Sequence, residues 1–107
     1  MRTLRFIVDG QRIRQDPDCD FSGLTPGTEN YLKAVFTFSG EWSKTNKVVG
    51  FYSNLGKEYE PQLLRDGCSC VIPPDATKKR ILKLCVFGKG DSYTLKTNRL
   101  AVEQKGG

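Results

Sequence analysis

The stretch Tyr31-Leu32-Lys33-Ala34-Val35-Phe36-Thr37-Phe38-Ser39 decides the fold. Apolar and polar residues alternate along it, so one face of an extended chain carries Leu32, Ala34, Phe36 and Phe38, and the other carries Lys33, Val35 and Thr37. This alternation is typical of a β-strand that buries one face in a hydrophobic core. We therefore expect residues 31–39 to form a core strand.

Runs of the same kind lie on both sides of this strand. Residues 4–8 and 11–14 flank Asp9-Gly10, a dipeptide that tolerates the positive φ values of a type I′ turn, so they predict an opening hairpin. Further runs rich in β-branched and aromatic residues predict strands near 47–53, 68–72, 81–87 and 93–103. The 81–87 run is apolar on both faces except at Lys83, as in a central strand. One short helical turn is expected within 73–79, where two prolines precede polar residues.

The pattern of about seven to eight short strands, with no long amphipathic helix between them, predicts an all-β domain. We expect an antiparallel, immunoglobulin-like β-sandwich, and a small β-barrel is the alternative. A chain of 107 residues suits one domain spanning 1–107. Its polar and glycine-rich tail is expected to fray from about residue 104.

Composition indicates an ordinary globular protein, with 37% hydrophobic and 27% charged residues. No apolar run approaches the roughly 18 residues of a membrane span, and no signal-peptide pattern follows Met1, so we expect a cytoplasmic product without membrane insertion. In that reducing compartment the four cysteines should be free and mostly buried; they are Cys19, Cys68, Cys70 and Cys85.

The sequence contains no histidine, which removes the Ser-His-Asp and Cys-His types of nucleophilic catalysis. Carboxylates are present, but none lies in an apolar context that would shift its pKa, so they are interpreted as solvated surface charges; the candidates are Glu41, Glu58, Glu60 and Asp75. We therefore expect a protein that is not an enzyme and carries no cofactor.

Three short motifs resemble ligand sites only in part. Carboxylates alternate in 16–20 as in a calcium loop, but Phe21 and Gly27 stand where an EF-hand has glycine and glutamate. Cys68-x-Cys70 lacks the spacing of a zinc knuckle, and Gly88-Lys89-Gly90 precedes a strand where a phosphate loop precedes a helix. We interpret the 16–20 segment as an Asx-rich turn, the two cysteines as thiols without a metal, and Gly88-Lys89-Gly90 as a hairpin turn. No metal is expected.

The net charge of +5 gives the surface a positive potential that attracts anionic partners. Two groups of basic residues are candidates for contact with an anion or a nucleic acid: Arg5, Arg12 and Arg14 on the opening hairpin, and Lys78, Lys79 and Arg80 after the prolines. Interleaved tyrosines at 31, 52 and 93 would stack on the bases of a single strand. The alternative is a solvated sheet face whose charge prevents edge pairing.

Loops and one aromatic residue are candidates for contact with a partner protein. Trp42 is either an exposed anchor for a partner or a sugar, or a core residue. The 16–28 loop presents Asp18 and Asp20, and the 54–58 turn presents Asn54 and Lys57. Exposed loops on a rigid scaffold commonly carry binding residues.

Several of these segments, taken in order, resemble one known group of proteins. They are residues 31–39, Glu41-Trp42, Lys47-Val48-Val49-Gly50-Phe51, Cys70-Val71-Ile72-Pro73, Val86-Phe87-Gly88 and Thr97-Asn98. Over roughly residues 4–103 the chain resembles the N-terminal domain of Firmicutes phage baseplate upper proteins and related prophage tail and tail-fibre proteins. The resemblance implies a β-sandwich virion module that docks a receptor-binding or fibre protein to the tail baseplate.

The expected function is therefore that of a non-enzymatic phage or prophage structural or accessory protein. Its expected partners are other tail or baseplate proteins, or further copies of itself in a homo-oligomer. We expect the protein in the cytoplasm of the producing cell and then in the virion. Two alternatives stay open: a barrel that binds single-stranded nucleic acid, and a carbohydrate or host-surface module that uses Trp42, the tyrosines or Lys89-Gly90-Asp91.

Overall fold

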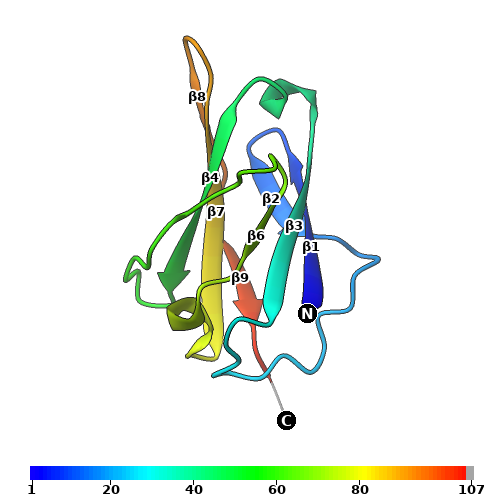
Figure 1. Ribbon diagram of the computed structural model, residues 1–107, viewed down its shortest axis with the longest axis vertical. Coiled ribbons are helices and arrows are strands. Elements are labelled where there is room, and N and C mark those ends of the chain that lie inside the picture. Colours follow the sequence, from blue (N-terminus) through cyan, green and yellow to red (C-terminus); the bar gives the residue numbers. More distant parts are fainter. Residues whose placement is uncertain (106–107) are drawn as a thin grey trace.

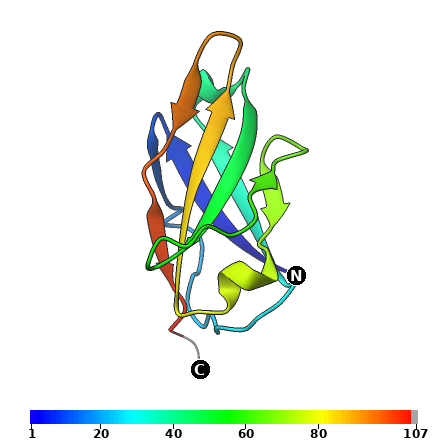
Figure 2. The ribbon, with the colours of Figure 1, turned by 90° about the vertical axis from the view of Figure 1, so that its left-hand side faces the viewer.

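The computed structural model describes residues 1–105, which form two packed β-sheets rather than a closed barrel (Figure 1). One sheet has the strand order β2-β1-β3-β6, and the other has the order β5-β4-β7-β8, with β9 also paired to β7. Figure 2 shows β4 and β7 in front of β1 and β3. The strand bounds are β1 Arg2–Asp9, β2 Arg12–Gln15, β3 Leu32–Phe38, β4 Asn46–Ser53, β5 Gln62–Leu63, β6 Ser69–Val71, β7 Ile81–Lys89, β8 Thr94–Lys96 and β9 Leu100–Glu103.

Two short 3-10 helices, η1 (Gly40–Trp42) and η2 (Pro74–Thr77), connect strands. The all-β class, the opening hairpin, the helical turn after the prolines and the central position of β7 are confirmed. None of the described residues forms a helix that is long and apolar enough to cross a membrane.

The prediction of a purely antiparallel sandwich is wrong, because β1 and β3 are parallel. A parallel pair needs a long return connection, and the Asp, Pro and Gly residues between β2 and β3 supply it. Arg2 anchors this return: its guanidinium donates to the carbonyl oxygens of Asp20 and Ser22, at 2.9 and 2.6 Å. The two strands therefore start side by side.

The predicted final strand, 93–103, is two strands separated by a bulge. The β7–β8 and β7–β9 registers differ by one residue, so Asn98 and Arg99 together oppose Cys85. Asn98 turns instead to β2, where its side-chain oxygen accepts from the Ile13 amide at 2.9 Å and its own amide donates to the Gln11 carbonyl at 3.2 Å. The bulge thus ties one sheet to the other.

A row of aromatic rings fills the core between the sheets. The centroid distances are 5.5 Å from Phe21 to Phe6, 5.3 Å from Phe6 to Phe36, 5.9 Å from Phe36 to Phe38 and 5.3 Å from Phe38 to Trp42. Aliphatic residues from both sheets complete the core; among them are Leu4, Val8, Val49, Leu84 and Val86.

Trp42 is fully buried, so its interpretation as an exposed anchor is wrong and the core alternative is correct. Its indole N–H donates to the Gly10 carbonyl at 2.7 Å, and its ring lies against the α-carbon of Gly88. A side chain at position 88 would clash with the ring, which explains the glycine there.

Two smaller predictions are corrected. Gln104, expected at the start of a fraying tail, is 2% exposed and donates to the carbonyl oxygens of Thr77 and Lys79; residues 106–107 of that tail lie outside the described residues. All four thiols are free as expected, but only Cys85 is buried, whereas Cys68 is exposed. Cys68 lies just before β6, in the turn that Asp66 caps.

Candidate functional site

The candidate site is a groove of about 500 Å³ between the turn after β4 and the start of β7. The end of β4 and η2, the elements beside this groove, lie at the lower left of Figure 1. The lining residues are Ser53, Asn54, Leu55, Lys57, Tyr59, Lys79, Arg80 and Ile81. The structure therefore brings together two pairs of candidates from distant segments, Asn54 with Lys57 and Lys79 with Arg80.

A tight turn forms one wall of the groove. The Ser53 side chain accepts from the Lys57 amide at 2.9 Å, and its backbone pairs with Lys57 and Gly56. Gly56 has a φ of +90°, which a residue with a side chain rarely adopts. This geometry leaves Leu55 at the tip with 96% of its surface exposed.

The segment after η2 forms the other wall. Thr77 is 1% exposed, and its hydroxyl donates to the carbonyl oxygens of Thr28 and Pro74. The Gln104 amide holds the backbone of Thr77 and Lys79 from behind, at 3.0 and 2.8 Å. These buried contacts fix the backbone that carries Lys79 and Arg80.

The groove lining carries three cations and no carboxylate. Arg80 donates to Glu103 at 2.9 Å, beside the groove, whereas Lys57 and Lys79 form no ion pair with any residue of 1–105. Lys57 and Lys79 also line an adjoining hollow, together with Lys78 and the carboxylates Glu58, Glu60 and Asp75. There Lys78 forms an ion pair with Asp75 at 2.9 Å, and this hydrogen bond raises the pKa of Lys78. Lys57 and Lys79 are thus free of ion pairs within the described residues and can meet a ligand's negative charge.

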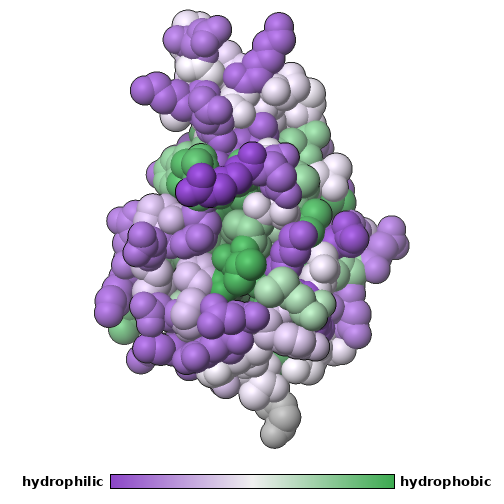
Figure 3. All heavy atoms as spheres, in the orientation of Figure 1, coloured by the Kyte–Doolittle hydropathy of each residue, from purple (hydrophilic) through white to green (hydrophobic). Residues whose placement is uncertain are grey.

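The same lining offers apolar surface from Leu55, Tyr59 and Ile81. Cations beside apolar side chains suit a ligand that has both a carboxylate and an aliphatic or aromatic group. Figure 3 shows the molecule from the side of Figure 1, with hydrophobic surface along the middle and mostly hydrophilic side chains at the lower left, over the end of β4. Within residues 1–105 no three Cys, Asp or Glu side chains gather closely enough to hold a metal ion.

Tyr52 lies on the outer face of the second sheet, near the groove, and is covered. Its ring packs over Gly50, and the Arg99 guanidinium stacks on it at 3.8 Å from the ring centroid. The Cys85 thiol donates to its hydroxyl at 3.7 Å, and burial raises the pKa of Tyr52 to about 12. Tyr52 is therefore not available to stack on a base, although sequence analysis named it for that role.

The hairpin arginines form a separate surface. Arg5, Arg12 and Arg14 are all exposed on the outer face of the first sheet, as the alternation predicted. Asp9 lies opposite Arg12 in the register, and the backbone of Asp16 pairs with that of Arg5, so carboxylates accompany the cations. Tyr31 and Tyr93 are exposed, but Tyr31 lies just before β3 and Tyr93 lies in the β7–β8 turn. They therefore do not form a row with these arginines.

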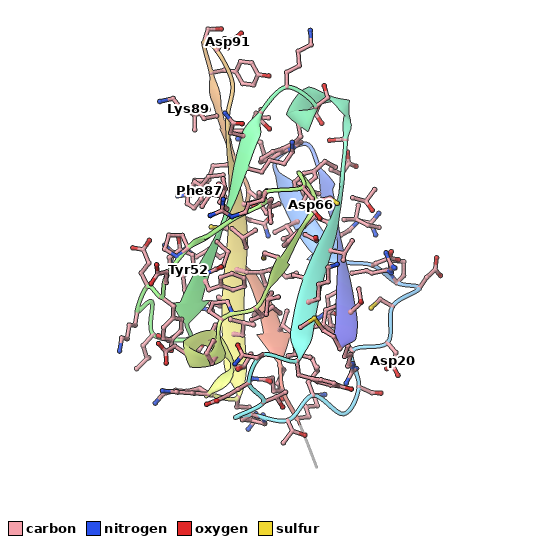
Figure 4. All side chains as sticks on the ribbon, viewed as in Figure 1. Asp20, Tyr52, Asp66, Phe87, Lys89 and Asp91 are labelled. Carbon is pink, nitrogen blue, oxygen red and sulfur yellow. The ribbon has the colours of Figure 1, made fainter. Side chains whose placement is uncertain are left out.

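The acidic candidates also lie away from the groove. Asp18 and Asp20 are exposed in the long return between β2 and β3. Hydrogen bonds from Ser22 lower the pKa of Asp20. In Figure 4, Asp20 is at the lower right of the molecule, whereas Tyr52 marks the opposite side near the groove. The structure therefore does not join the two sets of predicted partner contacts.

Sequence analysis missed three apolar groove residues, Leu55, Tyr59 and Ile81, and the supporting Gln104. An aliphatic residue inside the turn Asn54-Leu55-Gly56-Lys57 was the available signal, because such turns are usually polar. Comparisons with family models, curated proteins and solved structures found no match. The function is therefore inferred from the chemistry of the groove.

Proposed function

We propose that this chain is a non-enzymatic protein-docking domain that works as a structural or accessory component of a phage or prophage tail. The observation that carries the docking function is the groove, where Leu55 and Ile81 lie beside the free cations of Lys57 and Lys79. The absence of histidine from the sequence supports a role without catalysis.

An exposed leucine on a constrained turn favours a protein as the partner. Contact with a partner's apolar surface would remove Leu55 from water, and the turn holds it in place beforehand, so little conformational entropy is lost on binding. Carboxylates on the same partner would meet Lys57 and Lys79 and set its orientation. The partner surface is therefore acidic with an apolar residue at its centre.

The tail assignment rests on the sequence resemblance to phage baseplate and tail-fibre domains. In this proposal the chain is made in the cytoplasm of the producing cell and then joins the virion, where weak contacts act together because many copies are present. The two packed sheets support the immunoglobulin-like class of sandwich as part of the same proposal.

The groove is tested by binding to tail particles from the strain that encodes this chain, prepared after deletion of its gene. Purified wild-type chain is expected to bind these particles, and Lys57→Glu/Lys79→Glu is expected to bind at least about tenfold more weakly. The control is Lys44→Glu/Lys89→Glu, which makes the same change of charge at exposed positions outside the groove.

Equal loss of binding in both double variants would mean that net charge, rather than the groove, holds the chain to the particle. Full binding of Lys57→Glu/Lys79→Glu would remove the groove from the proposal. Far-UV circular dichroism and a melting curve establish that each variant is folded.

A further inference from the structure

The strand β9 has an unpaired edge. In its antiparallel pairing with β7, the Gln104 amide donates to the Arg80 carbonyl, so alternate residues 100, 102 and 104 direct their backbone groups to β7. Ala101 and Glu103 must then direct their N–H and C=O groups outward. No hydrogen bond within residues 1–105 satisfies those four groups.

The other sheet edges are each partly blocked. At β6 the Asp66 carboxylate accepts from the Ser69 amide, and Pro73 beyond the strand has no N–H. At β2 the Asn98 side chain occupies the Ile13 amide, and at β8 the Gln11 side chain occupies the Lys96 carbonyl. The remaining edge, β5, has only two residues. Natural proteins use such devices to limit strand pairing. β9 also begins at a bulge and carries charged side chains, but all four of its outward backbone groups are unoccupied within the described residues.

The edge of β9 is also accessible. A hollow of about 470 Å³ runs beside it, lined by Gln15, Phe21, Ser22, Gly23, Ala101, Glu103 and Lys105. In Figure 2, β9 forms the left margin of the molecule, with no strand beyond it. Another extended strand would approach these backbone groups through this hollow, beside the loop residues Phe21, Ser22 and Gly23.

The charges on this edge are complementary to themselves. Arg99, Ala101 and Glu103 alternate along the outer face of the sheet, and Ala101 is small and exposed. If a second copy lies antiparallel with Ala101 on the two-fold axis, Ala101 faces Ala101, and Arg99 of each copy faces Glu103 of the other. The neighbouring register with Val102 on the axis opposes Arg99 to Lys105, which are like charges, and the one with Leu100 on the axis opposes Arg99 to Ala101 and forms no ion pair.

We propose that two copies of this chain associate through β9, in the register that centres on Ala101, and form one continuous sheet across the two-fold axis. Such an interface is isologous, so each favourable Arg99–Glu103 contact occurs twice. Glu103 can take part while it accepts from Arg80, because its side chain stays 37% exposed and has a second carboxylate oxygen. Arg99, whose guanidinium stacks on the Tyr52 ring within one chain, leaves that ring to reach Glu103 of the second copy. The dimer presents two docking grooves on one particle.

The test uses reciprocal charge variants and sedimentation velocity over a range of concentrations. Wild-type chain is expected to be a dimer. Arg99→Glu places like charges opposite each other twice, and so does Glu103→Arg, so each variant alone is expected to dimerise at least about tenfold more weakly. An equimolar mixture of the two variants restores opposite charges at both contacts and is expected to form a heterodimer.

Arg12→Glu is the control, because it makes the same charge change at an exposed residue of the other sheet, and it should dimerise like the wild type. Recovery in the mixture also shows that the single variants are folded. A monomeric wild type would overturn the proposal and leave the edge to a strand of another protein. A dimer that both variants retain, or a mixture that stays monomeric, would overturn it as well.

Discussion

Replacement of Phe36 by alanine is expected to remove the centre of the aromatic row. Phe36 is 2% exposed and its ring contacts two others, Phe6 at 5.3 Å and Phe38 at 5.9 Å. A buried Phe→Ala change costs about 3–5 kcal/mol, because transfer free energy is lost and a cavity remains. The free energy of unfolding of a native domain is about 5–15 kcal/mol. The substitution is therefore expected to remove a large part or all of the stability.

The free energy of unfolding is measured by urea titration, with the fluorescence of Trp42, the sole tryptophan, as the signal. The matched control is Phe87→Ala on the outer face of the second sheet, where the ring is half-buried under the Lys96 ammonium and a smaller loss is expected. If Phe36→Ala cost less than about 1 kcal/mol, or no more than the control, the core assignment would be refuted.

Three further predictions concern packing, thiols and pH. Gly88→Ala is expected to destabilise by about 1–3 kcal/mol in the same titration, because a methyl group there meets the Trp42 ring; an unchanged midpoint would contradict this contact. Thiol labelling at neutral pH should modify Cys68 first and reach Cys85 only on unfolding, and equal rates would be inconsistent with their exposures. Since the pKa of Tyr52 is raised to about 12, the stability that its neutral form contributes is full below pH 10 and is lost as the pH rises through about 12. In Tyr52→Phe the free energy of unfolding, measured at each pH, should fall less steeply between pH 10 and about 12. If this pH dependence is the same as in the wild type, other groups cause the loss.

Local patterns predicted much of the fold. The alternation in β3 placed Leu32, Ala34 and Phe36 in the core, and Asp9-Gly10 marked the opening hairpin. These features depend on neighbours along the chain, which a sequence displays directly. The strand after the Gly88-Lys89-Gly90 turn was located correctly but not its division at Asn98.

The errors concern contacts between distant segments. The parallel pairing of β1 with β3 depends on how residues 16–30 return across the molecule, which alternation does not encode. The bulge exists because Asn98 bonds to β2, and Gln104 is buried because the η2 segment offers it two carbonyl oxygens. The local sequence around each of these polar residues carries no pattern that indicates its distant partner.

The candidate site was predicted in parts. Asn54, Lys57, Lys79 and Arg80 were named, but in two separate groups with different partners. Their convergence follows from the β4–β7 pairing, which places the end of one strand beside the start of the other. Trp42 was named as a possible partner contact and is not one. A residue of its size suits both a binding anchor and a core, and only its burial in the structure distinguishes the two.

The central claim is that this chain is a tail component, and its most direct test is the composition of the particles themselves. Tail particles are released from the strain that encodes the chain, banded on a density gradient and analysed by quantitative mass spectrometry. The account predicts that the chain bands with the tail proteins at a fixed ratio that survives high salt. A chain that stays at the top of the gradient with free proteins would contradict it.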